Sequence, residues 1–426
     1  MIDWKTKLQI RSFFRSSMWM FPLCCAAFAI LCAPLIRWMD YTWQPALFSF
    51  DVEGARSLLA AFIAASLSYI VFLASALLIA VQLMSASLSP RVIREFMVNW
   101  SYRIVLGLFI FTFIYSVAAL ARTTSTVQQL PLFVALMLNL SSVGAFLYLI
   151  DYVLRNFRPS AIVNRVSTQG LRVIEECYPS PSLAAERENP LNFGPPVRTI
   201  SHEGKSGVIL AVDLEGLVNC AKQAGSIFFF IPQVGDFVAK GEDLIEVYLN
   251  GDGINETAVR KSVAFGPERT MEQDPSFALR ILVDIAIKAL SAAINDPTTA
   301  VLALDQLQRL LLKIGMRQLD GGAARDDQGD ARLFLTKPHW EDFVALAISE
   351  IRIYGSGSIQ VCRRLEAMIK NTMDLLPQYR APALLKELEL LHSGAERSFP
   401  DMEDRLRAIT PDALGLGGGS KGNARW

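Results

Sequence analysis

The stretch LLAAFIAASLSYIVFLASALLIAVQLM, Leu58–Met84, contains no charged residue and decides the fold of this chain. A bilayer core of about 30 Å requires roughly 20 helical residues, so this stretch is long enough to cross a membrane. Comparable apolar runs occur at Met18–Ile36, Ile104–Ala121 and Leu130–Ile150, and none occurs after Leu154. The sequence therefore predicts four transmembrane helices followed by a large soluble region.

Charge and cysteine usage restrict the classes of function. The 426 residues include 41 Lys and Arg against 41 Asp and Glu, so no basic excess points to nucleic acid as a partner. The six cysteines form no CxxC pair, and with only three histidines no zinc-type spacing exists. We therefore predict no metal, no cofactor and no disulfide framework, which fits a soluble region in a reducing compartment.

Basic residues alternate between the two sides of the predicted spans. They are concentrated before the first span, between the second and third spans, and after the fourth: Lys5, Lys7, Arg11, Arg15, Arg91, Arg94, Arg103, Arg155, Arg158, Arg165 and Arg172. The remaining two connections carry few basic residues. By the positive-inside rule, this pattern places both termini and the soluble region in the cytoplasm.

The second predicted span differs from the others because it is rich in serine and alanine. Small and hydroxyl side chains allow helices to approach closely. We therefore expect this helix to be central, packed against neighbouring helices or another subunit. It is also longer than a perpendicular span needs, which predicts a tilt or an extension into the cytoplasm.

Two interpretations of the polar residues in this span remain open. In the first, Ser75, Gln82, Ser85 and Arg91 line a pore near its cytoplasmic mouth. In the second, which we favour for Gln82, the amide forms a hydrogen bond to a neighbouring helix. No ionisable residue lies in the middle of any predicted span, which argues against a proton relay but not against a gated pore or a passive anchor.

Composition divides the chain into five predicted parts. They are a transmembrane domain at 1–156, a connector helix and linker at 157–200, a small β-rich domain at 201–262, a helical domain at 263–395 and a flexible tail at 396–426. The predicted fold class is thus an α-helical membrane bundle followed by a cytoplasmic α+β region with a helical C-terminal part.

The small β-rich domain contains the pattern Val234-Gly235-Asp236-Phe237-Val238-Ala239-Lys240-Gly241. This pattern resembles the hairpins of barrel-sandwich domains, such as biotinyl and lipoyl carriers. The glycines allow tight turns between short strands. Lys240 lacks the residues that flank a modified carrier lysine, so the resemblance concerns architecture alone.

The C-terminal part is predicted to be mainly helical. Asp296 followed by Pro297 is a strong helix start, because Asp caps an N-terminus and Pro fits the first turn. Helices are predicted at Phe277–Ile294, from Asp296 to about Ile314, and at Trp340–Tyr354, Ile359–Leu375 and Ala381–Leu391, with a polar loop at Asp320–Asp330 and disorder at Gly415–Trp426.

The densest polar cluster surrounds the start of this helical part. Its candidate site residues are Arg269, Asp274, Arg280, Asp284, Asn295 and Asp296. Because the arginine fork suits phosphate or carboxylate, one interpretation is a site for a small anionic ligand. The other, which we favour, is a buried network of ion pairs that fixes helix packing.

Four stretches together resemble a bacterial family of predicted membrane proteins of unknown function. They are Ser66–Phe96, which includes Leu88-Ser89-Pro90-Arg91-Val92; Val208–Gly241; Phe265–Pro275, FGPERTMEQDP; and Leu282–Ala303, which includes AINDPTTA. The similarity extends from Met18 to about Leu391. It implies a multi-span protein of the bacterial inner membrane with a cytoplasmic domain, and it supplies no activity, substrate or catalytic residue.

Enzyme templates are absent from the sequence, which has no GxxxxGK[ST] loop, no HExxH and no GxSxG between a predicted strand and helix. We therefore predict no catalytic residue and rank an enzyme last. The first functional hypothesis is a homo-oligomeric channel or channel-like assembly in the lipid bilayer, regulated by its cytoplasmic domain. The alternative is a membrane-anchored ligand-binding or scaffold protein without transport activity.

Overall fold

Two compact units make up the chain, one formed by residues 10–161 and the other containing residues 162–426. The computed structural model describes residues 4, 17, 19–43, 45, 51–87, 91, 100–124, 127–179, 194–319 and 323–413. The basic N-terminal segment, most of the predicted linker and the glycine-rich tail lie outside these residues. The two units are therefore considered separately.

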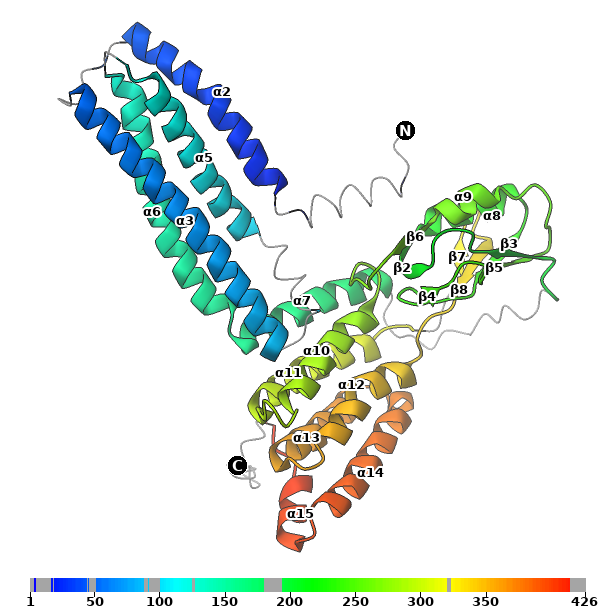
Figure 1. Ribbon diagram of the computed structural model, residues 1–426. Helices are drawn as coiled ribbons and strands as arrows, with labels where there is room; N and C mark the ends of the chain where they lie inside the picture. The colour runs from blue at the N-terminus through cyan, green and yellow to red at the C-terminus, as the bar shows by residue number, and fades with distance from the viewer. Residues whose placement is uncertain are drawn as a thin grey trace, which may run out of the picture. The chain divides into compact units, whose positions relative to one another are not determined.

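In the described part of the first unit, four long apolar helices run side by side (Figure 1). They are α2 (Met20–Trp43), α3 (Val52–Ser87), α5 (Trp100–Arg122) and α6 (Gln129–Asn156), and all four are apolar and long enough to cross a membrane. Helices α3, α5 and α6 each contain a predicted span, and α2 covers the first one from Met20 onward. At 36 residues, α3 is about 54 Å long, which exceeds the hydrocarbon thickness of about 30 Å.

The central helix of this unit is α5, whereas the sequence led us to expect the second span in that position. Helix α5 contacts α2, α3 and α6. In its most apolar 18-residue stretch, 39% is buried, against 17% in the corresponding stretch of each of the other three helices. Close approach of α2 is possible because Gly107 lies against Phe21 and Cys25. A hydrogen bond of 3.1 Å between the hydroxyls of Thr112 and Ser142 joins α5 to α6.

Helix α7 (Pro159–Cys177) follows the last membrane helix after a short break at Phe157 and Arg158. Pro159 starts the new helix, since proline is tolerated only in the first turn. Its apolar face packs closely on the rest of the second unit, since a Cβ added at Gly170 would lie 2.8 Å from the Cβ of Ala278. The connector is therefore a separate helix that belongs largely to the second unit.

Among the described residues of the second unit, eight strands form two sheets. The strands are β1 (Arg198–Ser201), β2 (Gly207–Val212), β3 (Ile227–Phe230), β4 (Phe237–Val238), β5 (Asp243–Tyr248), β6 (Val263–Gly266), β7 (Ala324–Arg325) and β8 (Ala331–Leu335). The five-stranded sheet has the order β1-β5-β3-β8-β7, and the three-stranded sheet has the order β4-β2-β6.

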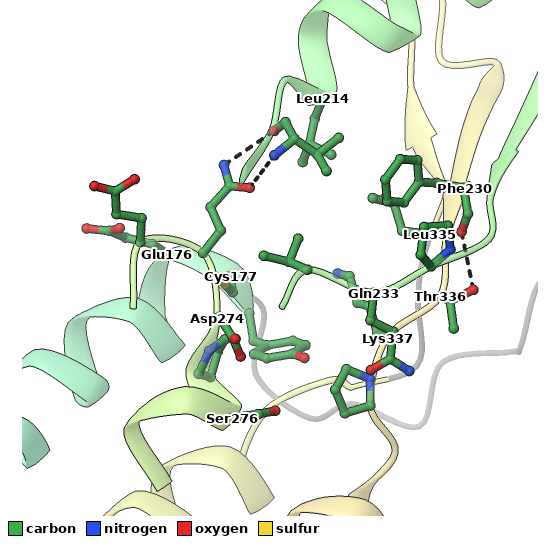
Figure 2. A pocket seen from close by; sticks show the side chains of 18 residues that line it. Glu176, Cys177, Leu214, Phe230, Gln233, Asp274, Ser276, Leu335, Thr336 and Lys337 are labelled. Atoms are coloured by element: carbon green, nitrogen blue, oxygen red, sulfur yellow. Dashed lines mark hydrogen bonds between the residues drawn. The ribbon is translucent and has the colours of Figure 1, made fainter. Parts of the chain in front are cut away.

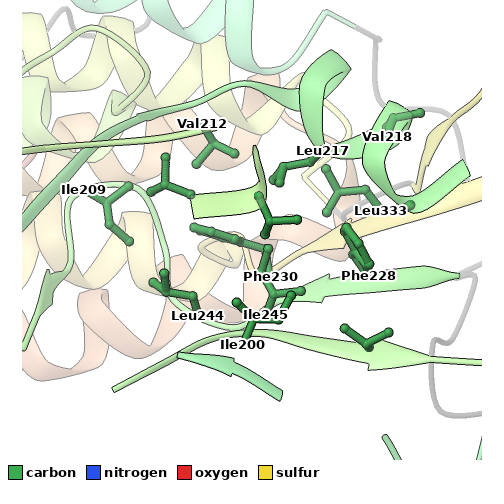
Figure 3. Packing of buried hydrophobic residues seen from close by; sticks show 14 of the residues in the cluster. Ile200, Ile209, Val212, Leu217, Val218, Phe228, Phe230, Leu244, Ile245 and Leu333 are labelled. Carbon is green, nitrogen blue, oxygen red and sulfur yellow. The ribbon is translucent and has the colours of Figure 1, made fainter. Parts of the chain in front are cut away.

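One hydrophobic core is shared by both sheets and by the short helices α8 (Leu214–Gln223) and α9 (Glu256–Lys261). Figure 3 shows Ile209 and Val212 of β2 facing the same core as Phe228 and Phe230 of β3. The turn glycines of the predicted hairpin, Gly235 and Gly241, have φ angles of 98° and 96°. Such values are accessible mainly to glycine, which explains its use at both turns.

Strands β7 and β8 lie in the segment that we expected to be a polar loop followed by helices. Strand β8 pairs in parallel with β3, with Phe228 opposite Leu333 and Phe230 opposite Leu335. This pairing joins segments about a hundred residues apart in the chain. The five-stranded sheet therefore combines the predicted β-rich region with strands from the predicted helical region.

The remaining elements are helices that pack on one another (Figure 1). They are α10 (Pro275–Ala289), α11 (Pro297–Gly315), α12 (Trp340–Tyr354), α13 (Ile359–Leu375), the 3-10 turn η2 (Gln378–Arg380), α14 (Ala381–Ser398) and α15 (Met402–Ile409). Asp296 caps α11 by accepting a hydrogen bond from the backbone N–H of Thr299, at 3.1 Å. The predicted bounds of α12 and α13 agree with the structure, whereas α14 extends past its predicted end.

Candidate functional site

A pocket of about 280 Å³ lies in the second unit at the carboxyl ends of β3 and β8. Because these two strands are parallel, their last residues, Phe230 and Leu335, meet at one edge of the sheet. Figure 2 shows Glu176, Cys177 and Asp274 on one side of the pocket and Gln233, Thr336 and Lys337 on the other.

Hydrogen bonds fix the walls of this pocket. The backbone N–H and the hydroxyl of Thr336 both donate to the carbonyl of Phe230, each at 3.2 Å, which extends the pairing of the two strands beyond β8. The side chain of Gln273 accepts from the N–H of Val212 at 2.8 Å and donates to its carbonyl at 3.3 Å. The residues that follow β8 and those that precede α10 are thus held in defined positions.

The side chain of Lys337 lies over the ring of Tyr178, with its nitrogen 5.2 Å from the ring centre. Within the described part of the chain, no carboxylate lies within 4.0 Å of this nitrogen. Burial lowers the pKa of Lys337, and the nearby thiol of Cys177 partly opposes this effect. A cation without a carboxylate partner in an apolar setting is costly, so this ammonium could bind an anion.

Two groups at the end of α7 line the other wall. Burial raises the pKa of the Cys177 thiol to about 12, although the Lys337 charge acts in the opposite direction. Burial also raises the pKa of Tyr178, whose ring makes an edge contact with Phe343 of α12. Both groups are therefore protonated at neutral pH, and neither supplies a negative charge to the pocket.

Asp274 is buried at the N-terminus of α10 and also lines the pocket. Its carboxylate accepts from the N–H of Phe277 at 3.1 Å and forms a salt bridge with the Arg269 guanidinium. Burial raises the pKa of Asp274, and Arg269 counteracts this increase. The carboxylate thus caps a helix and has its charge balanced by Arg269.

The other members of the predicted polar cluster lie further along α10. Arg280 forms hydrogen bonds with Asp284, at 2.7 Å, and with Glu350 of α12, at 3.0 Å. Asp296 caps α11, and its N–H donates to the carbonyl of Ala289 at the far end of α10. Asn295, in the same turn, has a φ of 50°. Since 15 residues of helix span about 22 Å, the structure separates the cluster into three groups.

The pore-lining candidates lie on or after α3. Ser75 and Gln82 are exposed, Ser85 is half-buried, and Arg91 is exposed. Ser68, Ser75 and Gln82 each lie two positions after a buried residue, namely Ser66, Leu73 and Ala80. Two positions correspond to about 200° around a helix, so the exposed polar residues face away from the rest of their unit. Within one chain, Gln82 is therefore not packed between helices.

Lys337, Tyr178 and Gln233 were not among the predicted site residues. Lys337 and Tyr178 are single residues in segments without a motif, and Gln233 directly precedes the Val234–Gly241 pattern but carries no chemical signal of its own. The signal that could have found Lys337 is the short apolar run Leu333–Leu335, which fits a short buried strand and whose end would place the following residues at a sheet edge. Among the described residues, no group of three or more His, Cys, Asp or Glu could hold a metal ion.

The four apolar helices and the α+β unit define a multi-span membrane protein with a large extramembrane domain. The chain belongs to the family described as "predicted membrane protein (DUF2254)", whose model matches residues 15–371. It is 26% identical over 380 residues to an uncharacterized protein of Mycobacterium tuberculosis and equally similar to one of Mycobacterium bovis. Each of these alignments covers 85% of this chain and 72% of the relative. No solved structure matches the chain significantly.

Proposed function

We propose that the chain forms a homo-oligomeric, channel-like assembly in which α3 faces the symmetry axis and the second unit regulates opening. The observation that supports this proposal is the outward-facing polar row of α3, defined as Ser68, Ser75 and Gln82. These residues recur every seven positions, a spacing that keeps side chains on one face of a helix that contacts a partner. An assembly around this face would give them polar surroundings.

The energetic reason concerns Gln82 in particular. An amide that faces hydrocarbon without a hydrogen-bond partner costs free energy, whereas Ser68 donates to the carbonyl of Ala64 in its own helix at 2.9 Å. Gln82 is exposed in the single chain. A neighbouring copy or a water-filled axis would satisfy its amide, and we propose that both are present in the open assembly.

The proposed location is the bacterial inner membrane with both termini in the cytoplasm. Loop charges support this orientation by the positive-inside rule. The opposite end of the bundle is held by two side chains: Asp40 accepts from the N–H of Leu130 at 2.7 Å, and Arg56 donates to the carbonyl of Thr123 at 2.9 Å. That end is the periplasmic one in this proposal.

Cysteine crosslinking in nanodiscs tests the assembly. In a chain whose six native cysteines are replaced by alanine, Gln82→Cys should form disulfide-linked dimers between copies. Met84→Cys, on the buried face of the same helix, is the matched control and should not crosslink. Monomeric particles together with no crosslinking at Gln82→Cys would reject the proposed assembly.

Flux measurements test conduction separately. Liposomes that contain the protein should pass a small cation or anion, and Gln82→Leu should change the rate because the proposed lining loses its amide. Leu83→Ala, at an exposed position one residue away, is the control and should conduct like the unmodified chain. An assembly that passes neither a cation nor an anion would contradict the channel function.

A second candidate function is favoured by the pocket in the second unit. A membrane-anchored ligand-binding protein needs no pore, and the pocket beside Lys337 provides a binding site of small-molecule size. Specific ligand binding by a protein that conducts no ion would favour this candidate over the channel.

A further inference from the structure

We infer that the pocket at the ends of β3 and β8 binds a small organic monocarboxylate with an apolar body, whose carboxylate pairs with Lys337. This inference goes beyond the proposed function because it names a site and a ligand class. Binding itself does not depend on conduction. Only the further step, regulation of a channel by this ligand, rests on the proposed function.

The charge of the ligand follows from the surroundings of Lys337. Its nitrogen contacts the Tyr178 ring, and no carboxylate of the described chain forms a salt bridge with it. An anion that enters the pocket would supply the missing partner, and a charge-assisted hydrogen bond of this kind is stronger than a neutral one. A cationic ligand would instead place two positive charges together.

The acidic residues of the lining do not compete with an anionic ligand for the ammonium of Lys337. The charge of Asp274 is balanced by Arg269, and its oxygens are already engaged with that side chain and with the first turn of α10. Glu176 is exposed and Glu272 is half-buried. Neither of these two glutamates contributes to the pKa of Lys337, so neither competes closely for its ammonium.

The apolar body of the ligand follows from the rest of the lining and from its size. Phe230, Val234 and Leu335 line the pocket together with several prolines. An apolar cavity of about 150 Å³ holds a benzene molecule, so 280 Å³ has room for a ring and a carboxylate. Typical ligand pockets start at about 300 Å³, so this pocket lies at the small end of the range and suits a small ligand.

The pocket is also well placed to influence the membrane helices. Glu176, Cys177 and Tyr178 form its wall at the end of α7, and α7 follows α6 in the chain after two residues. Glu175 of α7 forms a salt bridge of 2.5 Å with Lys313 of α11. A ligand that shifts the end of α7 would therefore act on the segment that leads directly from the last membrane helix.

Calorimetric titration of the full-length protein in nanodiscs tests the site, with benzoate as the probe. Benzamide and benzylamine have nearly the same size and shape but are neutral and cationic. Benzoate should bind, benzamide should bind about tenfold more weakly or worse, and benzylamine should not bind. Since these comparisons use the unmodified protein, they do not depend on the folding of any variant.

Substitutions then locate the binding. Lys337→Met should weaken benzoate binding at least about tenfold. Lys240→Met, which changes an exposed lysine on the turn after β4, is the matched control and should leave binding unchanged. Equal binding of benzoate and benzamide, no benzoate binding at millimolar concentrations, or unchanged binding in Lys337→Met would each overturn the inference.

The failure of this inference is distinguishable from failure of the proposed function. Benzoate binding that depends on Lys337, in a protein that conducts no ion, would preserve the ligand site and reject the channel. Conduction by a protein that does not bind benzoate would preserve the channel and reject the ligand site.

Discussion

The ammonium of Lys337 lies 5.2 Å from the centre of the Tyr178 ring, and this contact joins the end of β8 to the end of α7. A cation over an aromatic face gains about 0.5–2 kcal/mol. That gain offsets only part of the cost of removing an ammonium from water, which explains why burial lowers the pKa of Lys337. Without an anion, the contact therefore fixes the position of the ammonium but leaves the folded state with a net electrostatic cost.

Lys337→Met should raise the thermal stability of the ligand-free protein at neutral pH. Between the lowered pKa of the folded state and the usual value of about 10.5, the unfolded chain binds more protons at Lys337 than the folded chain does. The contribution of Lys337 to the free energy of unfolding therefore rises with pH in this window. The advantage of the variant should be largest near neutral pH and should disappear toward pH of about 10.5.

Melting temperatures of both proteins in nanodiscs, measured across this pH range, check the prediction. Cys177, Tyr178, and Asp274 with Arg269 also lie around Lys337, but their titration is common to both proteins and largely cancels in the difference. A difference that stays constant or grows as pH rises would contradict the assigned burial of the ammonium.

The sequence predicts those elements whose signals are local. Four apolar runs identify the membrane helices, and Asp296-Pro297 marks the start of α11. The pocket is not predictable in this way, because it depends on the pairing of β3 with β8, two short strands far apart in the chain. The central position of α5 is also missed, since serine and alanine content reports close packing but not which helix packs on which.

Arg280→Met should destabilise the second unit by about 1–2 kcal/mol without changing benzoate affinity. Arg280 joins α10 to α12 through Glu350 and also pairs with Asp284, so its loss removes both of these contacts. Hydrogen bonds with Glu350 and Asp284 raise the pKa of Arg280, which is consistent with a cation held by two carboxylates. Thermal melts and the benzoate titration provide the two measurements.

Arg407→Met is the matched control for that substitution, because Arg407 pairs with Glu403 on the exposed surface of α15. Exposed pairs contribute little, about 0–1 kcal/mol, and the control should melt close to the unmodified protein. If Arg280→Met weakened benzoate binding at unchanged stability, the cluster along α10 would belong to the ligand site after all.

Gly170→Ala and Gly394→Ala should shift stability in opposite directions. A Cβ at Gly170 would lie 2.8 Å from the Cβ of Ala278 and 3.2 Å from Leu310, so α7 must move away from α10 and α11. Overpacking of this kind costs about 1–3 kcal/mol. At Gly394 of α14, the added methyl group would meet nothing within 4 Å apart from its chain neighbours and the backbone of its own helix, and the helix gains up to about 1 kcal/mol.

Thermal melts of the full-length protein compare these two variants directly, since both substitutions add one methyl group within a helix of the same unit. The expected order of melting temperature is Gly394→Ala, then the unmodified chain, then Gly170→Ala. A Gly170→Ala protein that is as stable as the unmodified chain would mean that α7 does not pack closely on α10.

Asp40→Leu should destabilise the membrane unit by about 1 kcal/mol. Asp40 lies in the last turn of α2, and its carboxylate accepts a hydrogen bond of 2.7 Å from the N–H of Leu130 in the first turn of α6. Gln128, the residue at the N-cap position of α6, makes no side-chain cap. Asp40 therefore caps a helix that is 90 residues away in the chain, and its loss leaves a backbone donor without its partner.

Unfolding in sodium dodecyl sulfate, followed by circular dichroism, measures this effect in the full-length protein. Asp40→Asn keeps an oxygen acceptor in the same place and should lose less stability than Asp40→Leu. An equal loss in both variants would mean that the negative charge at the positive end of the α6 dipole, rather than the hydrogen bond, stabilises this end. No loss in Asp40→Leu would show that α2 and α6 do not depend on this contact for their association.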